Sequence, residues 1–358
     1  MNYLINSTAL LLAVFIGFSS HRASLCTVKA VAELLSSRRA FVLASFAKAT
    51  LWVAMIYGTL TFFIPLGSGT IQVYEPRWLA LLGGFLFGIG AAINGGCSLS
   101  TLQRLADGDL WMLLTLAGIG TGILAWSIAD VSLVLTHAIH VPLIWLQLGS
   151  WAAGILPILW MLAAWELIRL WQSRPRHMPL WQLPGVATYR LSTAALIIGL
   201  SGGLLYGLQG AWTYSNYLRT TIESIHQHNP PPGHFQAWLL AALLAGMVAS
   251  ALQRGSFKPR LSGATARLGR AGLTRRYVGG IVMGFGAAAI PGGNDTLILT
   301  GIPTLSGWAL GAYIALLFGV ATALTAMRMA GGNLPCIECS NDVCVEGEAA
   351  IGRTGEPA

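Results

Sequence analysis

The chain has 358 residues, of which 55% are hydrophobic and only 9% are charged. A soluble domain carries roughly 25% charged residues, so the composition excludes a soluble globule and predicts a protein whose solvent is lipid. The formal net charge of +8 calls for no nucleic-acid partner, because basic residues also set the orientation of membrane proteins.

Nine apolar stretches are long enough to cross a hydrocarbon core of about 30 Å. They lie near residues 3–20, 41–64, 78–106, 110–127, 145–169, 192–210, 236–252, 277–302 and 306–328. The first stretch has no basic segment before it and no cleavage pattern after it, so we interpret it as a retained span. The sequence therefore predicts an all-α integral membrane protein with about nine transmembrane spans in the lipid bilayer.

A glycine-rich repeat divides the spans into two sets. GGFLFGIGAAINGG at 83–96 matches GGIVMGFGAAAIPG at 279–292 with a constant offset of 196 residues. The two copies belong to the third and eighth spans, which cross the membrane in opposite directions, as in the inverted repeats of many transporters. We expect a first repeat of five spans at 1–170, a basic cytoplasmic linker at 171–191, a second repeat of four spans at 192–328 and a flexible cytoplasmic tail at 329–358.

Basic residues predict the orientation. With the N-terminus outside, all but three of the 21 Lys and Arg residues fall on the cytoplasmic side, as the positive-inside rule requires. The exceptions are Arg77, Arg219 and Lys48. We expect a multi-pass protein of the bacterial inner (cell) membrane, with its N-terminus outside and its C-terminus in the cytoplasm.

The first candidate site is the break NGGCSLS in the third span, which contains Gly95, Gly96, Cys97 and Ser98. Backbone amides at a helix start favour an anion, and a thiol is a weak donor that can contact sulfur without holding it tightly. Weak, sequential contacts suit conduction. Close packing of the glycines around a small buried cysteine is the structural alternative.

Two further segments join this candidate pathway. Cys26 follows Arg22 at the end of the first span, where the arginine would attract an anion, or would simply extend to the interface as an ordinary basic residue. In the second repeat, PGGND places Gly292, Gly293, Asn294 and Asp295 at the position of the cysteine loop. Asp295 is expected as a functional group or, in preference, as the N-cap of the short helix that follows.

The tail carries Cys336, Cys339 and Cys344. These three are too few for a four-ligand zinc site, so we expect reduced thiols and no metal. His226, His228 and His234 cluster in a Pro-rich external loop. We interpret this segment as a polar loop in preference to a metal site. With no phosphate-binding loop and no catalytic triad, the sequence predicts neither an enzyme nor a cofactor.

Together, SLCTV at 24–28, GAAINGGCSLS at 90–100 and PGGND at 291–295 resemble the YeeE/YedE thiosulfate transporter family over residues 8–328. The resemblance implies an hourglass-shaped bundle in which loops of both halves meet at a central constriction, and cysteines that pass thiosulfate along by S–H hydrogen bonds. Cys26 and Cys97 match two of the family's cysteines. The third is missing, because the second-half loop has Gly293 or Asn294 there.

The predicted function is import of a small sulfur-containing anion through a thiol-lined pathway. Thiosulfate is the preferred substrate. A related sulfur or selenium compound is an alternative substrate, and a cytoplasmic sulfur-carrier protein is a further candidate partner. A second hypothesis is a membrane-bound sulfurtransferase or redox subunit with a covalent adduct at Cys97. A third is an accessory subunit whose glycines serve only packing.

Overall fold

The computed structural model describes residues 2–63, 70–75, 78–133, 137–142, 145, 150–172, 185–186, 188–227, 230–259, 264–331, 336–340 and 342–347. The helices are α1 (Asn2–Arg22), α2 (Thr27–Ser37), α3 (Phe41–Phe63), α4 (Trp78–Asn94), α5 (Ser98–Ala106), α6 (Met112–Leu133), α8 (Ser150–Gln172), α9 (Leu191–Gln209), α10 (Tyr214–Gln227), α11 (His234–Arg254), α12 (Ala264–Ala289), α13 (Asn294–Thr296), the π-helix η2 (Leu297–Gly301) and α14 (Gly307–Met329). The strands are β1 (Thr70–Glu75), β2 (His137–Pro142), β3 (Cys336–Ser340) and β4 (Val343–Gly347).

The protein is an all-α membrane protein with two small hairpins at its edges. Eight helical segments of the described chain are long and apolar enough to span a membrane. The stretch expected at 277–302 is divided among α12, α13 and η2, and it is not one of these eight. The antiparallel pairs β1–β2 and β3–β4 were not predicted from the sequence.

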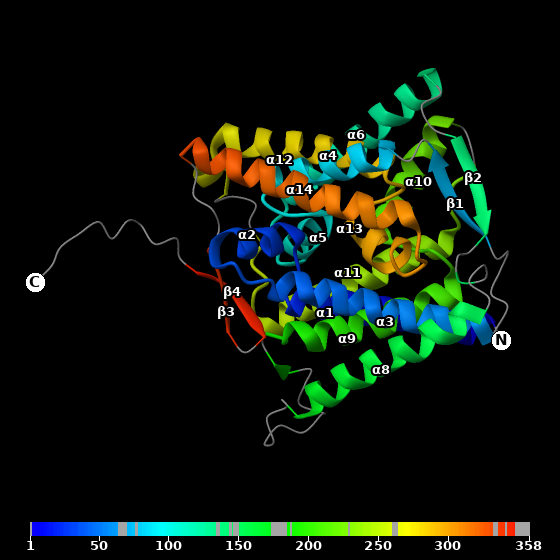
Figure 1. Ribbon diagram of the computed structural model, residues 1–358. Coiled ribbons are helices and arrows are strands. Elements are labelled where there is room, and N and C mark those ends of the chain that lie inside the picture. The colour runs from blue at the N-terminus through cyan, green and yellow to red at the C-terminus, as the bar shows by residue number, and fades with distance from the viewer. Residues whose placement is uncertain are drawn as a thin grey trace, which may run out of the picture.

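The long helices form two groups, and each group takes helices from both halves of the chain. One group packs α4 and α6 against α12 and α14, and the other packs α1 and α3 against α9 and α11. Figure 1 shows these groups as an upper and a lower layer, with α5 and α13 between them. Neither half of the sequence is therefore a compact unit by itself.

The repeated glycines lie where these helices cross. A Cβ atom on Gly90 would come within 3.0 Å of backbone atoms of Gly279 and Met283, and one on Gly286 would meet the backbone of Gly83 and Phe87. Small residues let membrane helices approach this closely. The preference for close packing therefore explains the glycines inside α4 and α12.

Equivalent glycines of the two copies also pack on equivalent partners. Gly84 of α4 lies against the Ala312 carbonyl of α14, and Gly280 of α12 lies against the Thr115 carbonyl of α6. Glycine at these two positions therefore lets α4 approach α14 and α12 approach α6.

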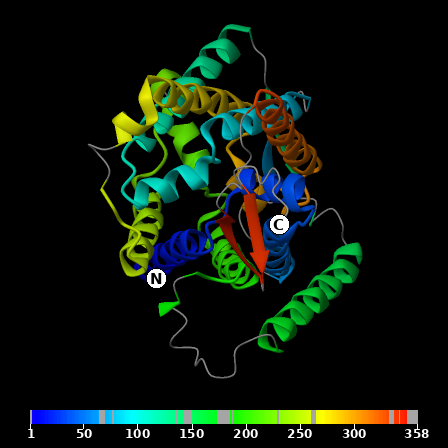
Figure 2. The same ribbon diagram turned by 90° about the vertical axis from the view of Figure 1, so that its left-hand side faces the viewer.

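Helix α8 stands at the margin of the molecule. It packs mainly against α3, and Figure 2 shows it set apart from the other helices. Its outer face carries a row of exposed apolar side chains, namely Ile158, Trp160, Met161, Leu162, Trp165, Leu167, Ile168 and Trp171. Lipid is the solvent that such a face requires.

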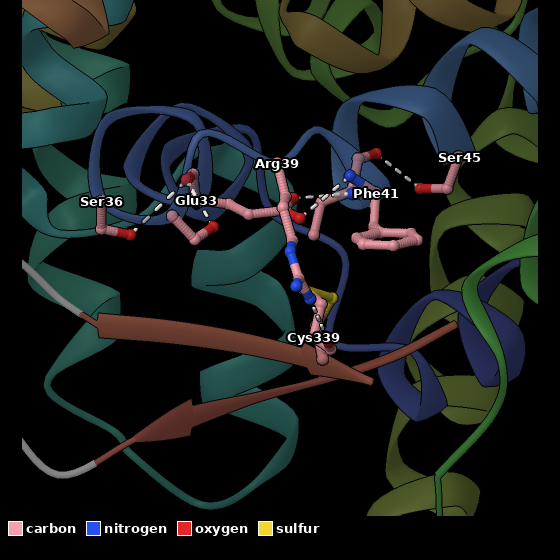
Figure 3. Close-up of a disulfide and its surroundings, with 9 residues drawn as sticks. Glu33, Ser36, Arg39, Phe41, Ser45 and Cys339 are labelled. Carbon is pink, nitrogen blue, oxygen red and sulfur yellow. Dashed lines mark hydrogen bonds between the residues drawn. A yellow bond between two sulfur atoms is a disulfide. The ribbon is translucent and has the colours of Figure 1, made fainter. Parts of the chain in front are cut away.

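The tail differs from its prediction. Residues expected to be flexible form the hairpin β3–β4, which packs against α2, while 348–358 lie outside the described residues. Cys339 and Cys344, expected as free thiols, form a disulfide. Figure 3 shows Arg39 donating to the Cys339 carbonyl and the buried Glu33 carboxylate accepting from the backbone of Phe41.

The expected basic linker at 171–191 is described only at Trp171, Gln172 and residues 185–186 and 188–191. Tyr189 and Leu191 are tied to the rest of the protein, because the Tyr189 amide donates to the Arg22 carbonyl and the Leu191 amide donates to the Asp342 carbonyl. Among the other predicted positions, Arg77 and His228 lie outside the described residues.

Candidate functional site

Cys97 begins a short helix in the middle of the protein. Helix α4 ends at Asn94, and Gly95 turns the chain with a φ of 78°, a left-handed conformation that glycine adopts without steric cost. Cys97 is then the N-cap of α5 and is 0% exposed. The break expected at Gly95 and Gly96 is thus a helix–turn–helix inside the protein.

The side chain of Asn94 holds this break in shape. Its amide nitrogen donates to the Gly96 carbonyl at 2.9 Å and to the Thr101 hydroxyl at 3.1 Å. Its amide oxygen accepts from the Thr115 hydroxyl of α6 at 2.9 Å. Because buried polar groups are costly when unpaired, this network fixes the direction in which α5 starts.

Cys26 follows α1, a helix of the second group, and lies near Cys97. It is the N-cap of α2 and is 1% exposed. The turn before it is held by Gln103 of α5, whose amide donates to the carbonyls of Ser20 at 3.0 Å and Leu25 at 3.3 Å. The N-terminal end of α2 is therefore anchored to the short helix that Cys97 caps.

The thiols of Cys26 and Cys97 lie close enough to interact with each other. The Cys97 sulfur lies near the backbone amides of Ser100 and Thr27, and the Cys26 sulfur lies near those of Cys97 and Lys29. These amides belong to the first turns of α2 and α5, where helix dipoles favour negative charge. The arrangement can accept an anion and present sulfur atoms to it.

The second-half loop takes the same position in its own helix break. Gly293 is the N-cap of α13, and the repeat offset of 196 residues equates it with Cys97. Asp295, expected first as that N-cap, is instead the second residue of α13. Its carboxylate accepts from the Ser215 hydroxyl at 2.5 Å and the Ser215 amide at 3.2 Å. The carboxylate thereby joins α13 to the start of α10.

Hydroxyl groups occupy the second half where the first half has thiols. The Tyr214 hydroxyl donates to the Ser98 hydroxyl, and Tyr214 lies close enough to both cysteines and to Asp295 to interact with them electrostatically. Thr213 and Thr296 share a hydrogen bond of 2.6 Å. Sequence reasoning missed these residues. Aligning HRASLCTV at 21–28 with QGAWTYSN at 209–216, by the order of the first and sixth spans, sets Tyr214 opposite Cys26 and could have found it.

A narrow cavity of about 50 Å³ lies beside these hydroxyls and contains Thr213, Tyr214, Asn294 and Asp295 in its wall. Asn294 is 1% exposed, and its Oδ1 has no hydrogen-bond partner in the described part of the chain. A larger polar cavity of about 430 Å³ shares Trp212 and Thr213 with the narrow one. The wall of the narrow cavity also contains Leu25, which precedes Cys26 in the chain, and Leu99 of α5.

The larger cavity contains a buried ion pair. Arg219 of α10 is 5% exposed and lies 3.5 Å from Glu223. The pair lies one helical turn apart on α10, so each side chain offsets part of the cost of burying the other's charge. Both the Arg219 guanidinium and the Glu223 carboxylate therefore line this cavity.

Arg22 is directed elsewhere. Its guanidinium donates to Ser250 at 3.0 Å, to Gln253 at 2.6 Å and to the Val186 carbonyl, so it ties α1 to α11 and to the segment before α9. Its expected role in attracting the anion stays a prediction.

A second polar cluster, around His21, shares Ser250 with Arg22. His21 bonds to Asp107 at 3.1 Å and to Ser250 at 2.9 Å. Burial acts to raise the pKa of the Asp107 carboxyl, but the bonds with His21 and Ser256 outweigh it and hold that pKa below its ordinary value. The charged carboxylate of Asp107 therefore stabilises its contacts with His21 at the end of α1 and with Ser256 after α11.

A metal could be held at one place in the described chain. The Glu33 carboxylate and the sulfur atoms of Cys339 and Cys344 lie within 4.8 Å of one another. The two sulfurs are joined in a disulfide, and metal binding would require their thiolate form. This group is separate from the Cys26 and Cys97 pair.

Comparison with known proteins agrees with the geometry. A sequence profile described as sulphur transport matches residues 22–322. The thiosulfate transporter TsuA of Spirochaeta thermophila is 25% identical over 339 residues, which cover 87% of this chain and 94% of that protein. The matched region includes both cysteines and both helix breaks, and the chain belongs to the sulphur transport (YeeE/YedE) family.

Proposed function

We propose that the protein imports thiosulfate through the centre of the molecule, past the Cys26 and Cys97 thiols. Its membership of a sulphur transport family supports a sulfur-anion transporter. The observation that carries the finer proposal is that the N-termini of α2 and α5 bring two free, buried thiols into contact between the two helix layers. Such a pair can receive an anion from amide donors and touch its sulfur through weak S–H contacts.

The proposed path has a polar side and a thiol side. The anion would pass from the cavity at Trp212 and Thr213 to Tyr214 and Asn294, and then to the cysteines. Because each step offers a few weak donors, no site would hold the anion tightly, as conduction requires. The hydroxyls of Thr213 and Tyr214 substitute for the family's third cysteine in this proposal.

The proposed orientation places the N-terminus outside and the β3–β4 hairpin in the cytoplasm of a bacterial cell. Arg39, Arg169, Arg190 and Arg328 lie in or next to segments that this orientation puts inside. Import would then deliver thiosulfate to the hairpin side, where a sulfur-carrier protein could receive it.

The test is uptake of labelled thiosulfate into proteoliposomes that contain the wild type, Cys26→Ala or Cys97→Ala. Cys336→Ser is the matched control, because it removes a thiol that belongs to the tail. We expect uptake by the wild type and the control, and at least a tenfold loss in either alanine variant with an unchanged melting temperature. Full uptake by both alanine variants would refute the thiol-lined pathway.

The contact between the thiols also favours a second candidate function, a sulfurtransferase. Attack of a Cys97 thiolate on the outer sulfur of thiosulfate would leave a persulfide on Cys97 and release sulfite. Intact-mass spectrometry after incubation with thiosulfate separates the two functions. A gain of one sulfur atom that disappears in Cys97→Ala supports transfer, and an unchanged mass together with uptake supports transport.

A further inference from the structure

A basic cavity lies between α3, α8 and the start of α9, apart from the proposed pathway. Its volume is about 730 Å³, and it shares no lining residue with the narrow cavity near the thiols. Four basic side chains line it: Arg39, Lys48, Arg169 and Arg190. Two acidic side chains, Glu166 and Asp342, also line it, which leaves a net charge of +2.

The acidic groups of the cavity are already engaged. Lys48 contacts Glu166 at 2.6 Å and donates to Ser192, also at 2.6 Å. The Asp342 carboxylate accepts from the Ser192 amide at 2.9 Å. With Lys48 paired to Glu166, the three arginines of the cavity outnumber its remaining carboxylate, that of Asp342, by two. The planar donors of arginine suit the oxygens of a phosphate group.

The position of the cavity favours a lipid over a free ion. Its lining residues come mainly from the start of α3, the last turns of α8 and the start of α9. Next to it, α8 exposes an apolar face on which Trp165 is 68% and Trp171 is 67% exposed. Acyl chains can lie along such a face, and tryptophan favours the level of the headgroups.

We propose that this cavity binds the phosphate headgroup of an anionic phospholipid, whose acyl chains lie along α8. Basic pockets between helices at the cytoplasmic side are suited to such headgroups. The bound lipid fills the gap between α8 and α9 and fastens α8 to the rest of the protein. This site does not depend on which anion is transported.

Thermal unfolding of the purified, delipidated protein tests the proposal. Cardiolipin, phosphatidylcholine or inorganic phosphate is added at the same ionic strength, and bound lipid is counted by native mass spectrometry. The wild type should gain several degrees and retain cardiolipin, while phosphatidylcholine and inorganic phosphate should give less than a third of that shift. An equal shift from phosphatidylcholine, or from phosphate alone, overturns the lipid site.

The variant Arg169→Gln removes one cation from an exposed position at the end of α8, so its folding should be intact. We expect at least threefold weaker retention of cardiolipin, and recovery of retention in Arg169→Lys. Arg328→Gln is the matched control, because it removes an exposed arginine from the end of α14. Equal retention by Arg169→Gln and Arg328→Gln would refute the assignment.

Discussion

At the scale of single residues, the centre of the protein is asymmetric. The first half contributes two thiols, and the second half contributes a glycine N-cap at Gly293 together with the hydroxyls of Thr213, Tyr214 and Ser215. Hydroxyls and thiols both donate hydrogen bonds, but the thiol is the weaker donor and the more polarisable group. Loss of a thiol on one side therefore need not remove a donor from the path.

Tyr214→Phe tests the contribution of these hydroxyls. The change removes the donor to Ser98 and keeps the aromatic ring, so the packing around Cys97 should persist. We expect thiosulfate uptake to fall about three- to tenfold, since a lost hydrogen bond costs about 1 kcal/mol. Tyr277→Phe, which removes a hydroxyl bonded to Thr121 on an exposed surface, is the control in the same uptake assay. Equal uptake by the two variants would contradict a role for Tyr214.

From the sequence we could predict the site residues whose role follows from their own residue type, without knowing which side chains face them. Cys26, Cys97 and the glycine breaks stood out because thiols and paired glycines are distinctive within apolar spans. Tyr214 and Ser215 did not, since hydroxyl residues are common near helix starts and their value depends on what faces them. For the same reason the sequence did not reveal that Asp295 bonds to Ser215, because Ser215 is 80 residues away in the chain.

At the scale of elements, the repeated glycines separate into two functions. Those inside α4 and α12 permit helix contact, and those at 95–96 and 292–293 change the direction of the chain. The sequence located the repeat because its spacing is regular. It could not divide the glycines between packing and turning, because that depends on the helix that approaches each one.

Gly286→Ala tests the contact between α4 and α12. The added methyl group would meet backbone atoms of Gly83 and Phe87, which cannot move aside as a side chain can. Overpacking of this kind costs about 1–3 kcal/mol, so the melting temperature should fall. Gly154→Ala is the control, since its Cβ has nothing within 4 Å. A melting temperature of Gly286→Ala equal to that of the control would contradict the close contact.

At the scale of the whole molecule, the tail hairpin bears on which side of the membrane the C-terminal segment lies. The disulfide of Cys339 and Cys344 lies at the end of the protein that basic residues predict to be cytoplasmic, where thiols are normally reduced. The sequence could not predict this pairing, because a short cysteine spacing indicates a reduced tail as readily as a hairpin. The register that places Cys339 opposite Cys344 exists only once the strands pair.

Labelling with a membrane-impermeant maleimide decides the compartment. If the proposed orientation is right, Cys339 and Cys344 should react after mild reduction in inside-out vesicles and stay unlabelled in intact cells. Cys26 and Cys97, which are buried, should label only after unfolding and so report that the protein is folded. Labelling of the tail from outside intact cells would reverse the orientation and place the disulfide in an oxidising compartment.

The mixing of both halves within each helix layer has a consequence for biosynthesis. Helices α4 and α6 leave the ribosome long before α12 and α14, the helices that they pack against. During that interval their glycine surfaces face lipid or another membrane protein. A nascent chain stopped near residue 250 should therefore be recognised by membrane chaperones and proteases, and the finished protein should escape them only after α14 has inserted.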